Sequence, residues 1–409
     1  MMRWITVFLA IGLACTAARP TPAQDAPTTA DELERFASRA IDFLRGQQGE
    51  TGGWGVREQG PVFPAITGLV TTGMLLDPAI DTSDPDVRRA IDFMLRYRQD
   101  DGGIYDRILP SYNTAICLSA LAIARDELPE ADAAIGPSVA FLRELQWGGT
   151  ASVPAALATE VNTVEPSHPF YGGVGYGNSG RPDNSNLTFW LQALEDAGVP
   201  GDDPAVQRAL AFLERTQMLG TVNDMPYAER SLQGGFIYAT SPSGDEGELG
   251  IGESKAGVIE ETLSDGTTES RLRAYGSMTY AGFKSYAYAG VKPGDPRVDA
   301  ALAWIGRNYT LEENPGIGTD GYYYYLLVFG RALGATGEPT VPTADGAADW
   351  TADLAAALLD RQQPDGSVAV VDDRWMESDP VLITAYSLIA AQNARRVLAD
   401  DTDNSGETP

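Results

Sequence analysis

The chain has 409 residues, of which 43% are hydrophobic, so it is long enough to bury a large core as one domain or two. Its 57 acidic residues outnumber its 29 basic residues, which gives a formal net charge of -28 at pH 7. A surface this acidic repels phosphate backbones and anionic lipids, so the composition excludes nucleic acid as a partner.

The first element along the chain is a predicted signal peptide at residues 1–24. Arg3 precedes the apolar run WITVFLAIGLA, and small residues and prolines follow it. We expect cleavage between Arg19 and Asp25 and therefore an exported protein, periplasmic or secreted. Lipidation at Cys15 is the less favoured alternative, because the residue three positions before it is not the usual leucine.

Removal of the signal peptide leaves Cys117 as the single cysteine, which excludes an intramolecular disulfide. The most apolar later run, YYYYLLVFGRALGA, is short and contains Arg331. We therefore expect no membrane-spanning segment in the mature chain.

Six amphipathic helices of one type recur along the chain. Their sequences are AIDFLRGQQ, AIDFMLRYRQ, SVAFLRELQ, ALAFLERTQ, ALAWIGRNY and LAAALLDRQQ. The apolar residues of the first fall on one helical face, so each helix is expected to pack on one side only. Asp-Pro pairs before three of them supply an N-cap and a first-turn proline. The helices are predicted to end at a glutamine or its substitute: Gln48, Gln99, Gln146, Gln217, Tyr309 and Gln363.

A second type of helix lies between these and is apolar nearly all round. The sequences are PAITGLVTTGMLL, YNTAICLSALAIA, NLTFWLQALEDAG, SMTYAGFKSYAYAG, GYYYYLLVFGRALG and DPVLITAYSLIAAQ. Such a helix is buried on all sides. The alternation predicts an all-α fold, an α/α toroid of six outer and six inner helices. One domain of six helix pairs is expected over residues 30–398, with loop insertions at about 150–180 and 218–275 and a disordered tail at 399–409.

The turn after the first amphipathic helix carries a motif formed by Phe43, Gln48, Gly52 and Trp54. The motif resembles the QW repeat of squalene and oxidosqualene cyclases, which is related to the repeat of protein prenyltransferase β subunits. The segments RPDNSNLTFWLQALEDAGV and RLRAYGSMTYAGFKSYAYAGV resemble exported bacterial prenyltransferase and squalene oxidase repeat proteins. The motif has a structural role, because the glutamine can bridge backbone groups while the tryptophan packs over the turn.

The residues that give these relatives their chemistry are mostly replaced here. Prenyltransferases hold zinc through Asp, Cys and His, but Ala115 stands at the Asp position two residues before Cys117, and the single histidine, His168, lies in a loop. We predict no metal site and no cofactor. Squalene-hopene cyclases protonate their substrate with an Asp-x-Asp-Asp segment. Here Asp183 remains in the segment DNSN, with Ser185 and Asn186 at the last two acidic positions.

Asp183 is therefore the candidate acid, and Tyr275 and Tyr280 are candidate proton donors or cation stabilisers. The acidic segment DDRWMESD, residues 372–379, is interpreted as a solvated loop. Aromatic faces can stabilise carbocations or bind a flat apolar ligand. The candidate ligand-binding residues are Asn113, Asn186, Phe189, Trp190, Tyr322, Tyr323, Tyr324 and Tyr325.

The leading hypothesis is an exported protein whose central aromatic cavity binds or transforms an isoprenoid or another apolar ligand. One alternative is a non-catalytic toroidal module that binds a protein or cell-surface partner, which the sequence does not identify. A second is a carbohydrate lyase or hydrolase, which needs two carboxylates across a cleft.

Overall fold

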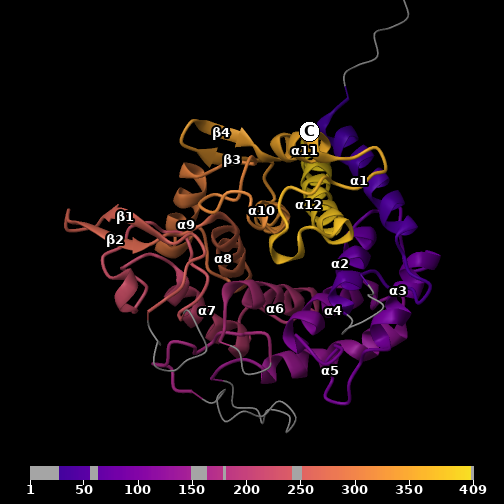
Figure 1. The fold of residues 1–409 in the computed structure, drawn as a ribbon, viewed down its shortest axis with the longest axis horizontal. Helices are drawn as coiled ribbons and strands as arrows, with labels where there is room; N and C mark the ends of the chain where they lie inside the picture. Colours follow the sequence, from indigo (N-terminus) through magenta and orange to yellow (C-terminus); the bar gives the residue numbers. More distant parts are fainter. Residues whose placement is uncertain (1–26, 56–62, 149–163, 178–180, 242–250, 407–409) are drawn as a thin grey trace, which may run out of the picture.

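The computed structural model describes residues 27–55, 63–148, 164–177, 181–241 and 251–406. Across these residues, six pairs of helices follow one another around a ring in chain order (Figure 1). The outer helices are α1 (Thr29–Gly46), α3 (Pro85–Leu95), α5 (Pro129–Glu144), α7 (Pro204–Thr216), α9 (Pro296–Arg307) and α11 (Trp350–Arg361). The inner helices are α2 (Pro64–Leu75), α4 (Pro110–Ala124), α6 (Asn184–Asp196), α8 (Gly276–Tyr288), α10 (Tyr322–Gly334) and α12 (Pro380–Gly406).

The inner helices form a closed ring. Each packs against the next inner helix, and α12 packs against α2, so the last repeat meets the first. Nearly every residue of α4 is buried, whereas α1 buries one face, formed by Leu33, Phe36, Ala37, Ala40, Ile41 and Leu44. The predicted α/α toroid is confirmed, and the two helix types differ in burial as their periodicity indicates.

The outer helices begin where the Asp-Pro pairs predict. Asp84 precedes Pro85 at the start of α3, and its side chain accepts hydrogen bonds from the N–H groups of Asp86 and Val87. Asp203 and Asp295 cap α7 and α9 in the same way.

A glutamine at the end of the outer helix joins one repeat to the next. Gln48 Nε2 donates to the carbonyl of Gly52 in its own turn, at 2.9 Å, and to that of Asp86 in α3, at 2.8 Å. Gln146 and Gln217 repeat this arrangement. Their carbonyl partners in the next outer helix are those of Ala205 in α7 and Arg297 in α9, each at 2.8 Å.

The same bond closes the ring. Gln362 Nε2 donates to the carbonyl of Gly366, at 3.3 Å, and to that of Phe36 in α1, at 3.0 Å. The sequence prediction placed this role on Gln363, which is exposed, and the correct residue is one position earlier. Gln362 stands four residues before Gly366, as Gln48 stands four residues before Gly52.

The glycine of this turn is required because the next outer helix lies against it. At Gly52 (φ +89°) a Cβ would lie 2.6 Å from the carbonyl oxygen of Arg89 in α3, and at Gly366 (φ +94°) it would lie 2.1 Å from that of Arg39 in α1. The second repeat lacks the glutamine bridge, since Gln99 is exposed and donates only to carbonyls near its own turn, those of Tyr97 and Tyr105.

Trp54 ties the outer helix to the inner helix of the first repeat. Its ring is buried and its Nε1 donates to the carbonyl of Leu44 in α1, while its backbone N–H donates to the hydroxyl of Thr67 in α2. In the structure, the motif formed by Phe43, Gln48, Gly52 and Trp54 connects the two layers and the neighbouring repeat.

The predicted insertion at 218–275 contains a short 3₁₀ helix, η2 (Pro226–Ala228), and an antiparallel hairpin of β1 (Val258–Thr262) and β2 (Thr268–Leu272) at the edge of the ring (Figure 1). Glu261 is buried beneath the hairpin, where its carboxylate accepts hydrogen bonds from the Ser231 hydroxyl and the Leu232 N–H. A second hairpin, β3 (Thr340–Thr343) and β4 (Gly346–Asp349), precedes α11.

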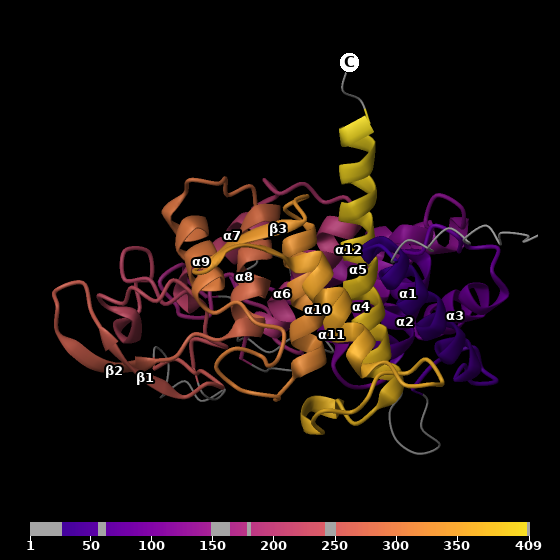
Figure 2. The same ribbon diagram turned by 90° about the horizontal axis from the view of Figure 1, so that it is seen from above.

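The C-terminal segment differs from the prediction of disorder from residue 399. Helix α12 continues to Gly406 and rises above the ring (Figure 2). Val397 is the last residue of this helix in the buried core, so the final turns continue through backbone hydrogen bonding after packing against the ring has ended. Within the described ranges, no helix combines the length and apolarity needed to cross a bilayer. The predicted signal peptide and Cys15 lie outside those ranges.

We expect Gln217→Ala to lower the free energy of unfolding by about 3 kcal/mol. The variant leaves two backbone carbonyls and the buried Tyr286 hydroxyl, 2.9 Å from Gln217 Oε1, without their partner. The matched control Gln99→Ala, at the exposed glutamine, should cost no more than about 0.5 kcal/mol. Urea denaturation of both variants measures the difference, and equal losses would contradict the bridging role of Gln217.

Candidate functional site

A cavity of about 310 Å³ lies at one mouth of the ring, where the N-termini of the inner helices meet. Every inner helix contributes a residue from its first turn to the wall. These residues are Ala65, Tyr112, Ser185, Ser277, Tyr324 and Leu382. The cavity is therefore a product of the closed ring, because no single repeat supplies more than a small part of it.

The cavity wall is mainly apolar and phenolic. Its apolar part is formed by Phe63, Ala65, Ile66, Leu69, Leu109, Met278, Met376 and Leu382. Its phenolic part is formed by Tyr112, Tyr176, Tyr238, Tyr275, Tyr324 and Tyr386. Among the described residues of the wall, Glu377 and Lys255 are the charged ones. Such a lining suits a ligand that is largely apolar and has few polar atoms.

Lys255 is already engaged within the protein. Its ammonium group forms an ion pair with Glu253 and lies 4.6 Å from the centre of the Tyr238 ring. The guanidinium of Arg181 also pairs with Glu253 and stacks on Tyr238, at 5.1 Å from the ring centre. These contacts fix Tyr238 at the cavity wall, and the single carboxylate of Glu253 is shared by the two positive charges.

Glu377 is the buried carboxyl group of the cavity. Its side chain is 1% exposed, and its two oxygens accept the backbone N–H groups of Tyr323, at 3.0 Å, and Tyr324, at 2.8 Å. The carboxylate thus caps the first turn of α10. Burial raises its pKa to about 7, with the charge of Asp372 adding to the rise, while the N–H groups of the first turn oppose it.

A strained turn places Glu377 at the cavity. The preceding residues form a short 3₁₀ helix, η4 (Arg374–Met376), in which Trp375 and Met376 have φ of +54° and +70°. Both lie in the left-handed region, which is unfavourable for side chains of this size. An ion pair between Arg374 and Asp320 ties η4 to the segment before α10. Trp375 remains half-exposed at the rim.

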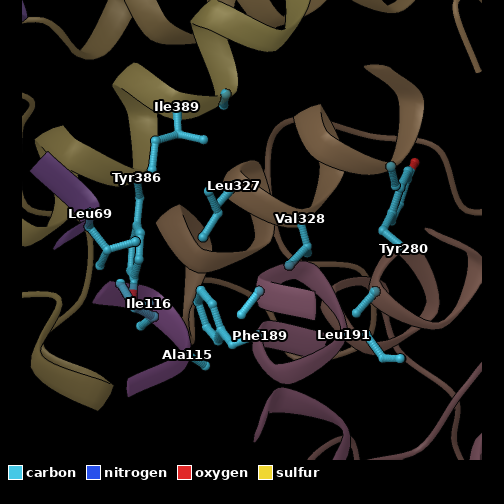
Figure 3. Close-up of a cluster of buried hydrophobic side chains, with 14 of the residues drawn as sticks. Leu69, Ala115, Ile116, Phe189, Leu191, Tyr280, Leu327, Val328, Tyr386 and Ile389 are labelled. Carbon is cyan, nitrogen blue, oxygen red and sulfur yellow. The ribbon is translucent and has the colours of Figure 1, made fainter. Parts of the chain in front are cut away.

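Buried hydrophobic side chains of the inner helices form a cluster inside the ring (Figure 3). Phe189 lies one helical turn beyond Ser185, and its ring packs edge-on against Tyr112 with the centroids 4.9 Å apart. Leu327 and Ile116 are buried in the same cluster.

Of the residues predicted from the sequence, Tyr275 and Tyr324 line the cavity. Phe189 lies beneath them. Others join elements within the core: Tyr322, Tyr323 and Tyr325 donate their hydroxyls to the carbonyls of Leu311, Ala369 and Thr310, and Trp190 Nε1 donates to Leu142. Tyr280 is fully buried against Tyr325 and Phe329. These five residues do not belong to the cavity wall.

Asp183 lies at the N-terminus of α6 and acts as its cap. One carboxylate oxygen accepts the N–H of Asn186 and the other accepts its side-chain amide, both at 2.9 Å. Burial raises the pKa of Asp183, and the hydrogen bonds from Asn186 oppose the rise. The side chain is 2% exposed and does not line the cavity. Ser185, which stands at an acidic position of the cyclase motif, does line it.

Asn113 also has a capping role. Its Oδ1 accepts the N–H of Ala65 in α2, and its Nδ2 donates to the carbonyls of Ile108 and Leu109. These bonds join the second inner helix to the first, so Asn113 holds a cavity-lining residue in place rather than facing the cavity itself.

Glu377 is the functional candidate that the sequence analysis missed. The segment DDRWMESD contains several acidic residues and was interpreted as solvated, which is wrong for Glu377. Position within the inner helix does indicate some wall residues, because the third residue of the helix lines the cavity in five repeats. This rule predicts Tyr112 as well as Tyr324. No comparable pattern points to Glu377, because η4 is an irregular connection.

In the part of the chain that the structure describes, no cluster of three His, Cys, Asp or Glu side chains is arranged to hold a metal ion. Cys117 is buried in α4, and burial in an apolar environment raises the pKa of its thiol. It occupies a core position at the contact with Gly68 of α2.

Comparison with known proteins supports the resemblance seen in the repeats. No protein-family model matches the chain. The squalene–hopene cyclase of Zymomonas mobilis is 28% identical over 143 residues, which span 29% of this chain and 21% of the cyclase. The chain thus matches about a fifth of the length of this curated relative.

Solved structures share the architecture. The type II terpene cyclase MstE from Scytonema aligns over 91% of this chain and 100% of its own, with a TM-score of 0.51 and 15% identity. The chain has the α/α toroid fold. An unsaturated glucuronyl hydrolase specific for heparin (TM-score 0.53, 90% of this chain and 98% of its own) and a D-mannose isomerase (0.54, 92% and 100%) align as well, each with 12% identity. The toroid therefore occurs in terpene cyclases and in enzymes that act on sugars, so the fold alone does not assign a function.

The raised pKa of Glu377 predicts a pH-dependent contribution to stability. Folding takes up a proton here between about pH 4.5 and 7, so the stabilisation is present at low pH and is lost as the pH rises through 7. At about 1.4 kcal/mol per pKa unit, the full difference is about 3 kcal/mol.

Glu377→Gln removes this titration. The free energy of unfolding of the variant, relative to the wild type, should therefore increase by up to about 3 kcal/mol between pH 5 and pH 8. Urea denaturation across this range measures it. A difference between variant and wild type that stays constant over the range would contradict the assignment.

Proposed function

We propose that this protein binds an isoprenoid or a similarly apolar ligand in the cavity at the N-terminal mouth of the ring. The observation that carries the proposal is the wall itself, in which eight apolar side chains and six tyrosines surround a space with one buried carboxyl group, that of Glu377. The resemblance to squalene–hopene cyclase and the shared fold with MstE support this class of ligand. A structure of an MstE variant contains geranylgeranyl dihydroxybenzoate, with a TM-score of 0.52 to this chain.

The cavity volume selects the size of the ligand. A volume of about 310 Å³ lies near the lower limit of ligand sites, which span ~300–1,000 Å³. A cavity near this limit favours a short isoprenoid chain over a triterpene such as squalene.

The proposed function is binding. Cyclisation by the squalene–hopene route is not proposed, because the side chains at the acidic positions do not supply the required acid. That route needs a strongly acidic carboxyl group beside the substrate. Ser185 lines the cavity at one of the acidic positions, while Asp183 is turned into a cap. The cavity does not support glycoside hydrolysis either, because that reaction requires two facing carboxylates and the described wall contains only that of Glu377.

Binding can be tested with geraniol, farnesol and squalene by equilibrium dialysis. We expect the two shorter alcohols to bind and squalene not to bind. Ala65→Trp places an indole ring in the cavity and should weaken binding at least tenfold. The control Ala303→Trp makes the same change at an exposed site on α9 and should leave binding unchanged. Absence of binding to the correctly folded wild type would refute the proposal.

Export is the second part of the proposal, and it rests on the sequence of residues 1–24. Expression of the full chain in a bacterial host followed by fractionation should give a protein outside the cytoplasm that begins between Arg19 and Asp25. Mass spectrometry of the N-terminus checks the cleavage. Recovery of the intact chain from the cytoplasm would contradict export, and a lipid-modified Cys15 would favour the lipoprotein alternative.

A further inference from the structure

One end of the cavity differs chemically from the rest of its wall. Glu377 and Tyr324 both line it, and they are joined by the hydrogen bond from the Tyr324 N–H to the Glu377 carboxylate. The Tyr324 hydroxyl is buried and lies beside Ser185 without forming a hydrogen bond of normal geometry. A buried polar group in this state is costly, and such groups often mark the place of a bound partner.

The Glu377 carboxylate can accept more hydrogen bonds than it receives from the protein. Two carboxylate oxygens offer about four acceptor positions, and backbone N–H groups of α10 occupy two of them. With its side chain 1% exposed, bulk water does not fill the others. Glu377 forms no ion pair within the described ranges, and the nearby charge of Asp372, another acid, adds to the rise of its pKa.

We propose that Glu377 and Tyr324 bind the hydroxyl group of a short isoprenoid alcohol, whose hydrocarbon chain lies along the apolar wall. The hydroxyl donates to the Glu377 carboxylate and accepts from the Tyr324 hydroxyl, so each of these two groups gains a partner. This inference rests on the proposed binding of an isoprenoid and adds the chemistry of the polar end of the ligand.

The charges around the cavity favour an alcohol over an acidic or phosphorylated ligand. A carboxylate or diphosphate would face Glu377, and the repulsion would oppose binding. Lys255 cannot balance the charge, because its ammonium group already pairs with Glu253 and stacks on Tyr238. A hydrogen bond from a neutral hydroxyl to a buried carboxylate is, by contrast, among the stronger kinds.

The inference can be tested with three probes of one carbon skeleton: geraniol, its methyl ether and geranyl diphosphate. Dialysis at about pH 8 keeps Glu377 ionised. We expect the wild type to bind geraniol about tenfold more tightly than the ether, which lacks the donor, in line with the value of a hydrogen bond to a charged group. The diphosphate should bind more weakly than the alcohol.

Three variants test whether Glu377 and Tyr324 cause the preference for the alcohol over the ether. Glu377→Leu should remove the preference for alcohol over ether, while Glu377→Gln and Tyr324→Phe should reduce it and keep the volume of the wall. Glu261→Gln is the matched control, because it removes a buried carboxylate that accepts a backbone N–H and does not line the cavity, and it should retain the wild-type ratio. If Glu377→Leu does not fold, the ratio of alcohol affinity to ether affinity in the wild type, Glu377→Gln and Tyr324→Phe still tests the inference.

Equal binding of alcohol and ether by the wild type would overturn the inference while leaving the proposed binding of isoprenoids intact. Tighter binding of the diphosphate would also overturn it, as would an unchanged ratio in both Glu377→Gln and Tyr324→Phe. Failure of all three probes to bind the wild type would instead count against the proposed function itself.

Discussion

The structure depends on one repeated contact, in which the end of an outer helix is bound to the side of the next outer helix. A glutamine side chain donates to two carbonyls, one of a glycine in the following connection and one in the next outer helix, and that glycine allows the neighbouring backbone to come close. Because the bonds go to main-chain carbonyls, the next helix can change its side chains without loss of the contact. This explains how the repeats diverge in sequence while the ring stays closed. The inner helices, which form the cavity, pack directly against one another inside this outer ring.

The candidate site follows from the direction of the inner helices. Their first turns meet at one mouth, and each first turn has backbone N–H groups that need acceptors. Asn113, Asp183, Asn314 and Asp379 satisfy four of these turns by side-chain capping. Glu377 satisfies a fifth, with the difference that it also lines the cavity. This helix cap is also the acidic side chain of the described cavity wall, with a pKa that burial has moved toward neutrality.

The sequence predicted the fold more completely than the site, and the reason is physical. Helical periodicity averages over many residues, so the amphipathic outer helices and the apolar inner helices were identified even where the glutamine motif had decayed. Apolarity of an inner helix does not show which of its side chains reach the cavity. Tyr280 and Tyr324 both lie on largely buried inner helices, but only Tyr324 lines the cavity. Glu377 was inaccessible to pattern reasoning because its position is set by a strained connection, in which Trp375 and Met376 adopt a backbone conformation that their residue types do not favour.

The hydrogen bond from Gln362 to Phe36 joins the last repeat to the first, which affects the stability of the terminal repeats. In an open array of repeats, the terminal units have an unpaired side and need special capping sequences. Here every inner helix packs against the next, and α12 packs against α2, while the bridge from Gln362 binds the last unit to the first. The ring of inner helices therefore has no terminal unit with an unpaired side. A circularly permuted chain that starts at another repeat is therefore expected to form the same ring.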